Sequence, residues 1–178
     1  MPKPYKILTT PNEILNKPVT AVSKFDKRLK GIVDRMVATL DVQTDPPGVG
    51  LAANQIGLCL AIFVIKKNKN DKPQVFINPE ILEKGKLMQN LEDSPNCSFE
   101  GCLSIPRIWS PVDRFDWVKV KFQDLSGNVL IKKFSGMDSV IVQHEVDHLN
   151  GILFTKRVME QNKNLYKEVG NKFVKIDL

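Results

Sequence analysis

The sequence predicts an α+β fold in which antiparallel strands pack around a central helix, with an amphipathic helix before it and a basic segment after it. Three observations lead to this expectation. Valine and isoleucine together number 32 against five alanines, and β-branched side chains favour strands over an all-helical bundle. Apolar residues recur at helical spacing towards both ends of the chain, and the region between them has the alternation or short apolar runs of strands. No repeat or Pro/Ser-rich linker divides residues 1–178, so we expect a single domain.

The first element is an amphipathic helix over about 26–42. Its apolar residues recur at helical spacing and form one stripe: Leu29, Ile32, Val33, Met36, Val37 and Leu40. Ser23 or Asp26 is positioned to cap its start. The segment Asp45-Pro46-Pro47-Gly48 follows and ends the helix, because consecutive prolines remove hydrogen-bond donors and fix φ.

Strands are expected next. Residues 58–65 read as a buried strand, and residues 75–77 as a short one that ends at Asn78-Pro79. Residues 117–123 alternate apolar and polar side chains, and the turn-forming residues 124–128 lead to a hairpin partner at 129–134.

Two further helical patterns complete the chain. The first covers about 138–149, where Gly151 is suited to end the helix in the left-handed conformation. The second, weaker and basic, covers about 159–169 within a basic tail at 159–178. The helix at 138–149 is the predicted central helix.

The composition excludes several classes of protein. The longest apolar run, residues 58–65, is far shorter than the roughly 20 residues that a membrane-spanning helix needs, so no membrane partner is expected. Three cysteines, an odd number, do not make a disulfide framework, which favours the cytoplasm. The net charge of +6 is spread along the chain, so a solvated basic surface is favoured over nucleic-acid binding and no specific DNA partner is expected.

The sharpest motif is a His-Glu-x-x-His pattern formed by His144, Glu145 and His148 in the helix expected at 138–149. Residues four apart share a helix face, so both imidazoles can reach one metal ion. Glu145 follows the first ligand and can exchange a proton with a metal-bound water. The pattern therefore makes the central helix a metal-binding one.

The identity of the third ligand stays open on the residues alone. Catalytic metal sites usually have three protein ligands and an open position, and the candidates are Cys102, Glu160 and Glu168. Cys59 lies inside the first expected strand and is predicted to be buried packing. Cys97 has polar neighbours and receives no role.

A glycine-rich segment at 48–55 reads GVGLAANQ. It lacks the Gly-Lys-Ser/Thr ending of a phosphate loop, and by itself it is best interpreted as a tight turn. Gln55 at its end offers an uncharged amide donor that is suited to polarising a carbonyl oxygen.

Together these segments resemble a known family. GVGLAANQ at 48–55, EGCLS at 100–104 and QHEVDHLNG at 143–151 resemble, in this order and at these separations, the three signature motifs of peptide deformylases. The resemblance extends from about residue 7 to residue 154 and thins out in the tail. The family releases formate from the N-terminal formyl-methionine of newly made bacterial proteins. The resemblance therefore implies a metal-dependent hydrolase that acts on N-formylmethionyl nascent peptides.

The resemblance implies a role for each matching residue. The implied ligands of one divalent metal ion are Cys102, His144 and His148. The family's usual physiological metal is Fe²⁺, whereas purified members often hold Zn²⁺ or Ni²⁺. Glu145 is the implied acid and base, and Gln55 and the backbone N–H of Leu103 are the implied donors to the substrate oxygen.

Substrate-binding positions follow from the same match. The backbones of Val49, Gly50 and Gly101 are expected to pair with the bound peptide as an added strand. Val49, Val140 and Ile141 match positions that line the family's methionine pocket, although ordinary core packing explains either helix residue about equally well.

Two residues are expected to support the metal ligands, and several positions differ from the common pattern of the family. Asp147 does not share the face of the two histidines, so it is expected to support the ligands rather than bind the metal, and Arg114 matches a family arginine that can pair with it. The departures bear on peptide preference and cleft access, and they are Ala38, Asp45-Pro46-Pro47, Arg107, Trp109 and Ser139.

Two alternatives remain. His-Glu-x-x-His also serves peptidases, so cleavage inside a peptide is the competing reaction. A ribosome- or RNA-binding module with a structural metal is the alternative from another class, and the two roles can coexist. It rests on the basic residues near the C-terminus: Lys156, Arg157, Lys163, Lys167, Lys172 and Lys175.

Overall fold

The computed structural model describes residues 2–90, 97–170 and 172–176. The α-helices are α1 (Lys27–Asp41), α2 (Met137–Leu149) and α3 (Phe154–Glu160), with short 3-10 helices η1 (Glu13–Asn16) and η2 (Ala53–Ile56). The strands are β1 (Gly50–Ala52), β2 (Ile62–Ile65), β3 (Gln74–Lys84), β4 (Leu87–Met88), β5 (Phe99–Cys102), β6 (Ile105–Pro111), β7 (Arg114–Phe115), β8 (Trp117–Gln123), β9 (Val129–Ser135), β10 (Leu165–Val169) and β11 (Lys172–Ile176).

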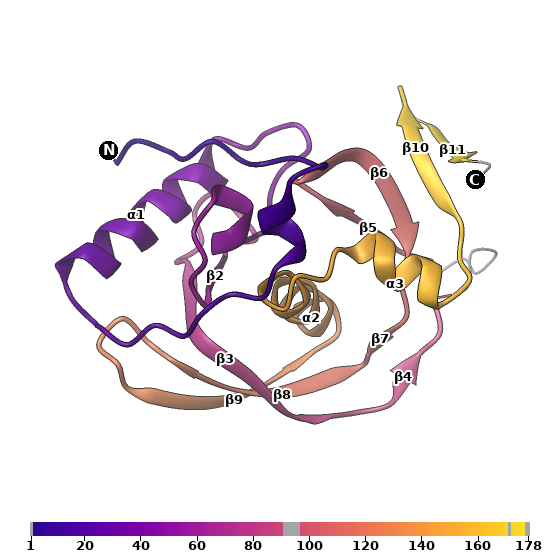
Figure 1. Cartoon of the computed structure of the whole chain (residues 1–178). Coiled ribbons are helices and arrows are strands. Elements are labelled where there is room, and N and C mark those ends of the chain that lie inside the picture. Colours follow the sequence, from indigo (N-terminus) through magenta and orange to yellow (C-terminus); the bar gives the residue numbers. More distant parts are fainter. Residues whose placement is uncertain (1, 91–96, 171, 177–178) are drawn as a thin grey trace.

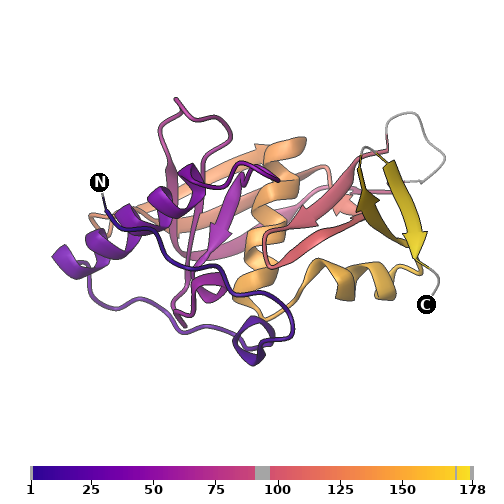
Figure 2. The same cartoon turned by 90° about the horizontal axis from the view of Figure 1, so that it is seen from above.

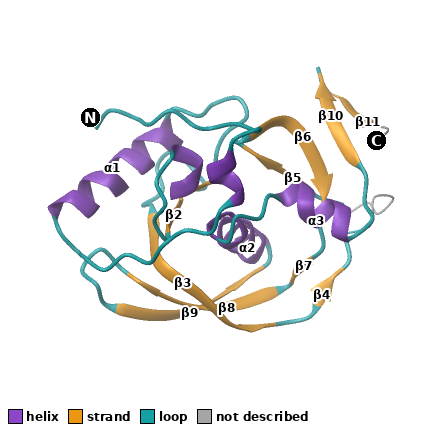
Figure 3. Cartoon of the chain, in the orientation of Figure 1, coloured by secondary structure: helices purple, strands orange, loops and turns teal. Residues whose placement is uncertain are grey.

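Antiparallel sheets surround one helix. A five-stranded sheet has the order β1-β2-β3-β8-β9, a four-stranded sheet has the order β11-β10-β6-β5, and β4 pairs with β7. Helix α2 is seen end-on between these sheets in Figure 1, and Figure 3 shows how the strands enclose it. This mixed architecture of antiparallel sheets and three α-helices confirms the α+β prediction.

The burial of α2 differs from that of a surface helix. Its buried side chains lie on several sides, because they face β1 and β2 as well as β7, β8 and β9. A helix that is buried all round is enclosed by the fold. Beyond its end, Gly151 has φ of +71°, and a Cβ atom there would meet the Asn16 backbone at 2.7 Å. Glycine therefore allows η1 to pack closely against the end of α2.

Helix α1 packs on the side of the five-stranded sheet that carries β1 and β2 (Figure 2). Asp26 caps its start, since Asp26 Oδ1 accepts a hydrogen bond from the Leu29 N–H at 2.9 Å. Leu29, Val33 and Met36 are buried against a cluster that includes Leu51 of β1. This packing supports the strand from which the cleft described below is built.

The C-terminal prediction was wrong. A helix was expected over 159–169, but α3 ends at Glu160 and the following residues form the β10–β11 hairpin. Strand β10 pairs with the edge of β6 through Tyr166–Trp109 and Lys167–Ile108, and Leu165 packs into the core beside α3. Pairing with an available strand edge and burial of Leu165 outweigh the local helical pattern.

The first two predicted strands also differ from the observed ones. Only Ile62–Ile65 of the segment 58–65 is regular strand, and Cys59, predicted to be buried, is exposed in the loop before it. Strand β3 does not end at Asn78-Pro79 but continues to Lys84. The ladder to β8 shifts register between Ile77 and Glu80, so the proline occupies a bulge in which no ladder hydrogen bond is lost.

Candidate metal centre and active site

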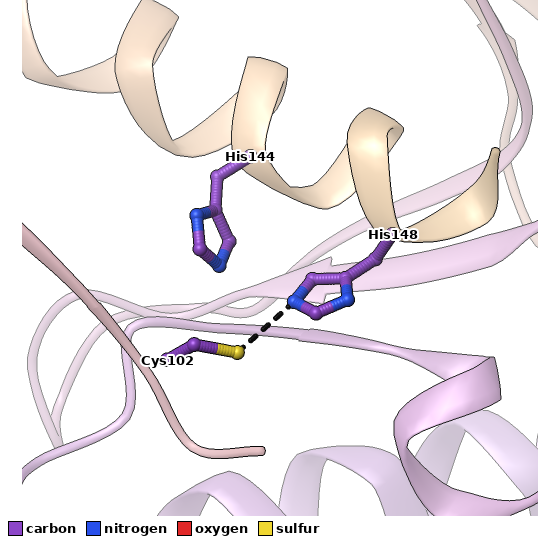
Figure 4. A group of neighbouring side chains, drawn as sticks. All are labelled: Cys102, His144 and His148. Atoms are coloured by element: carbon purple, nitrogen blue, oxygen red, sulfur yellow. Dashed lines mark hydrogen bonds between the residues drawn. The ribbon is translucent and has the colours of Figure 1, made fainter. Parts of the chain in front are cut away.

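Three ligand-type side chains meet beside α2. Cys102 ends β5, and His144 and His148 project from successive turns of α2 towards it (Figure 4). Cys102 Sγ lies 3.1 Å from His148 Nε2, and one ligand atom from each of the three residues lies within 4.8 Å of the others. This group can hold a metal ion, and the spacing of four residues on the helix explains why both imidazoles reach it.

The geometry favours the ionised form of the cysteine. Burial alone would raise the pKa of the Cys102 thiol, but the charges and hydrogen bonds of His148 and His144 hold it well below its ordinary value. The Ser104 N–H also donates a hydrogen bond to Cys102 Sγ at 3.4 Å. The thiolate is the form that ligates metals.

A chain of buried charges supports His144 from behind. His144 Nδ1 lies 3.1 Å from Glu100 Oε2, which leaves Nε2 for a metal ion. Arg114 donates to both oxygens of Glu100, at 2.8 and 2.9 Å, and to Asp147 at 2.6 Å. Asp147 is also held by Arg157 through two hydrogen bonds, at 2.7 and 3.1 Å. These pairs fix the orientation of the His144 ring.

The same contacts set the protonation of Glu100. Burial alone would raise its pKa, but the Arg114 charge and hydrogen bonds, together with His144, lower the pKa to about 2. Glu100 is therefore a carboxylate at neutral pH and can accept the Nδ1–H of His144.

Glu145 is buried with only 3% of its surface exposed. Burial raises its pKa to about 7, although the nearby His144 and His148 lower it in part. Glu145 Oε2 and His148 Nδ1 have no hydrogen-bond partner among the described residues. A carboxylate with a pKa near neutrality and a free oxygen is suited to accept and return a proton.

The donor set fits a late transition metal. One thiolate and two imidazoles are ligands typical of Zn, Fe or Ni sites rather than of Mg or Ca sites. Glu145 stands beside the three ligands with its orphaned oxygen, as expected of a residue that contacts a metal-bound water and not the metal. The residues present therefore fit a catalytic metal ion.

Gln55 is fixed next to this group. Its Nε2 donates to Ser104 Oγ at 3.1 Å and to Cys102 Sγ at 3.5 Å, and its Oε1 accepts from the Ala52 N–H at 2.8 Å. The side chain is 2% exposed. An amide donor thus lies beside the metal ligands, in a position that its neighbours determine.

A cleft of about 230 Å³ opens onto the ligands. Its lining includes all the residues for which substrate contacts were predicted: Val49, Gly50, Gly101, Val140 and Ile141. Leu103, Gln55 and Glu145 also line it, together with Trp109 and Phe99, which belong to the four-stranded sheet. A larger hollow of about 680 Å³ lies behind α2 near Asp147 and Arg157, and none of the three ligands lines it.

The remaining candidates for a third ligand lie elsewhere. Glu160 pairs with Arg157, and Glu168 pairs with Arg107, so neither joins the ligand group. The sequence interpretation gave no role to Glu100 or to the contact of Arg157 with Asp147. Glu100 could have been found as the acidic residue that precedes the glycine of EGCLS, but the fold alone brings Arg157 to Asp147.

The fold and the site together define a metallohydrolase whose central helix presents two imidazoles and an acid–base carboxylate beside a thiolate. The family model described as Polypeptide deformylase matches residues 4–164. Among curated proteins, the peptide deformylase of Desulfotalea psychrophila is 36% identical over 167 residues, covering 92% of each chain. That of Mesorhizobium japonicum is 39% identical over 177 residues, covering 98% of this chain and 92% of its own.

A solved structure gives the same result. The crystal structure of peptide deformylase from Thermotoga maritima aligns with a TM-score of 0.75 at 35% identity, covering 86% of this chain and 97% of that one. The chain belongs to the polypeptide deformylase family. Members of this family are hydrolases that remove the formyl group from the N-terminal formyl-methionine of new proteins, and this is the activity of the chain. Among the described residues, no helix has the length and apolarity to cross a membrane.

Proposed function

We propose that the chain deformylates nascent peptides in the cytoplasm with one divalent metal ion held by Cys102, His144 and His148. The observation that carries this proposal is the convergence of these three side chains beside the buried Glu145, with Cys102, His144 and Glu145 lining a cleft. Fe²⁺ is the proposed physiological metal, and Zn²⁺ or Ni²⁺ are the proposed metals of protein purified in air.

The metal, when bound, acts as a Lewis acid that lowers the pKa of a water molecule. Glu145 takes the proton of the attacking water on its carboxylate oxygen. The water oxygen bonds to the formyl carbon, the C–N bond of the formamide then breaks, and Glu145 passes the proton to the departing nitrogen. The products are formate and a free methionine N-terminus, so Glu145 ends in the state in which it began.

Charge that develops on the formyl oxygen needs donors. We propose that the Gln55 amide and the Leu103 backbone N–H supply them, since both residues line the cleft next to Cys102. Donors fixed before the reaction stabilise the transition state without reorganising. The bonds from Gln55 to Ser104 and Ala52 support this role because they hold the amide in place.

Peptide binding involves the two sides of the cleft. The backbones of Val49, Gly50 and Gly101 are proposed to pair with the substrate as an added strand. Val140 and Ile141 are proposed to contact the methionine side chain together with Val49, and all of these residues line the cleft. Behind the ligands, Arg114 and Asp147 are proposed to orient His144 through Glu100.

The deciding experiment is an assay of formate release from formyl-Met-Ala-Ser with anaerobically purified protein of measured metal content. The expected products are formate and the deformylated tripeptide Met-Ala-Ser, with both peptide bonds intact. Cleavage inside the peptide would instead indicate a peptidase and would refute the proposal. Inactivation in air with recovery on addition of Ni²⁺ is expected if Fe²⁺ is the native metal.

A second proposal concerns ribosome docking by the basic C-terminal segment. Lys167 and Lys172 are exposed on one face of the β10–β11 hairpin. Deleting residues 159–178 would also remove the buried Leu165, so substitution is the sharper test. Replacing both lysines by glutamate is expected to weaken sedimentation with ribosomes in low salt. Unchanged sedimentation would contradict the proposal.

A further inference from the structure

Four aromatic side chains form a continuous patch on one face of the four-stranded sheet. Each strand contributes one ring: Phe99 from β5, Trp109 from β6, Tyr166 from β10 and Phe173 from β11. The Phe99 centroid lies 5.0 Å from those of both Tyr166 and Phe173, and Trp109 lies 5.8 Å from Phe173. We call these four residues the aromatic platform.

The register of the sheet explains why the rings share a face. Gly101 pairs with Trp109, Trp109 pairs with Tyr166, and Tyr166 pairs with Lys175. Residues two positions apart on a strand point the same way, so Phe99 joins the face through Gly101 and Phe173 joins it through Lys175. The β10–β11 hairpin, whose first strand lies in the segment 159–169 that was predicted to be helical, therefore supplies half of the platform.

The platform is continuous with the active-site cleft. Phe99 and Trp109 line the cleft, whereas Tyr166 and Phe173 extend the same surface away from the metal ligands. The indole of Trp109 lies over Gly101, where a Cβ atom would come within 2.7 Å of the ring. Gly101 thus provides the space that brings an aromatic ring next to the proposed peptide-binding backbone.

Charged groups hold the indole in this position. Trp109 Nε1 donates to Glu168 Oε2 at 3.0 Å, and Arg107 donates to Glu168 Oε1 at 3.0 Å. Arg107 also donates to Asp45 Oδ2 at 2.6 Å, which ties β6 to the loop before β1. Arg107 and Trp109, two of the positions that differ from the common family pattern, thereby belong to one hydrogen-bonded group at the mouth of the cleft.

We propose that the aromatic platform binds apolar side chains of the nascent peptide downstream of its formyl-methionine. This inference rests on the proposed function, because it requires the formyl group to lie beside the metal ligands Cys102, His144 and His148. Among the described residues, strand β5 is one of the two outer strands of its sheet and the one that lines the cleft, and a substrate strand beside it runs from Cys102 towards Phe99.

The distances assign the residues of the substrate. Three residue steps separate Cys102 from Phe99, which is about 10 Å of strand. With the formyl carbon near Cys102, the methionine lies beside Gly101 and the third residue lies beside Phe99. Because successive side chains of a strand point to opposite faces, one of the third and fourth residues faces the platform. Phe173 is 47% exposed, so ring surface is available to an apolar side chain there.

The test compares substrates of different length and polarity on the metal-loaded enzyme. The tripeptide formyl-Met-Ala-Ser is measured beside formyl-Met-Ala-Phe-Leu-Ser and formyl-Met-Ala-Ser-Gly-Ser. We expect kcat/KM for the apolar pentapeptide to exceed that for the polar one at least fivefold, with the difference mainly in KM. Phe173→Ser is expected to reduce this ratio at least threefold. A ratio of two substrates does not depend on the fraction of active enzyme.

Val174→Ser is the matched control, because Val174 is a neighbouring exposed residue, 51% exposed, on the opposite face of β11. It is expected to leave the ratio unchanged. Equal kcat/KM values for the two pentapeptides in the wild type would overturn the proposal. A ratio of these values that Phe173→Ser does not change would overturn it as well. Self-association that Phe173→Ser abolishes would also overturn it, since a second copy would then cover the platform. Failure of the proposed function is distinct, because the tripeptide would then release no formate.

Discussion

Replacing Gly50 by alanine tests how closely the acid–base group is positioned. A Cβ atom at Gly50 would lie 2.8 Å from Glu145 Cδ and closer still to Glu145 Oε1. Ordinary contact begins at 3.4 Å, so the carboxylate must withdraw by at least about 0.6 Å. A displacement of ~1 Å at a reacting group can cost ~100-fold in rate. We therefore expect kcat to fall between about 10-fold and 100-fold.

Gly50→Ala is expected to lower kcat and not the stability of the fold, because the group that must move is the end of the flexible Glu145 side chain. The assay is formate release from formyl-Met-Ala-Ser, combined with metal analysis and thermal unfolding. Gly31→Ala in α1 is the control, since a Cβ atom there has open space and alanine favours a helix interior by about 0.5–1 kcal/mol. Wild-type kcat in Gly50→Ala with full metal content would refute the assigned position and role of Glu145.

Further predictions concern the ligands and the buried charges. Cys102→Ala should lose both stoichiometric metal and activity, and full metal content with full activity would contradict its assignment as a ligand. Glu145→Gln should retain metal by elemental analysis while kcat falls roughly 10²- to 10⁴-fold; a smaller loss would argue against a proton-transfer role. Arg114→Met should lower the free energy of unfolding in urea by roughly 3–5 kcal/mol, because it removes the positive charge beside the buried Glu100 carboxylate and leaves that carboxylate only its contact with His144. The pKa of Glu100 is lowered to about 2 from 4.5, so its stabilisation is complete above about pH 4.5 and is lost as pH falls towards 2. That stabilisation is about 3 kcal/mol in total and comes from Arg114 and His144 together. The share of Arg114 is measured as the pH-dependent difference in stability between the wild type and Arg114→Met, and the absence of such a difference would show that Arg114 does not lower this pKa.

The sequence predicted the elements whose patterns are local. The stripe of α1 and the alternation in 117–123 need no information from elsewhere in the chain, and the His-Glu-x-x-His spacing places two imidazoles on one helix face. The ligand role of Cys102 was different, since the residues alone left it undecided and did not exclude Glu160 or Glu168. Only the resemblance in EGCLS raised it, and the fold then brought its sulfur to His148.

What the sequence did not predict depends on contacts between distant segments. The hairpin β10–β11 forms because β6 offers an edge to Tyr166, and no local pattern encodes that partner. Arg157 was interpreted as part of a basic surface, yet its guanidinium holds Asp147. Cys59 has apolar neighbours in sequence but lies in the loop before β2, where Leu58 and Leu60 are partly buried and Cys59 is exposed.

The β10–β11 hairpin also affects how the molecule meets other copies of itself. An unpaired strand edge is a template for intermolecular β-pairing and aggregation. Strand β10 covers the β6 edge, and the new outer strand β11 carries Lys172 and Lys175, whose charges disfavour further pairing. A chain shortened before Leu165 would expose the β6 edge beside the cleft, so the last two strands remove one template for pairing between copies.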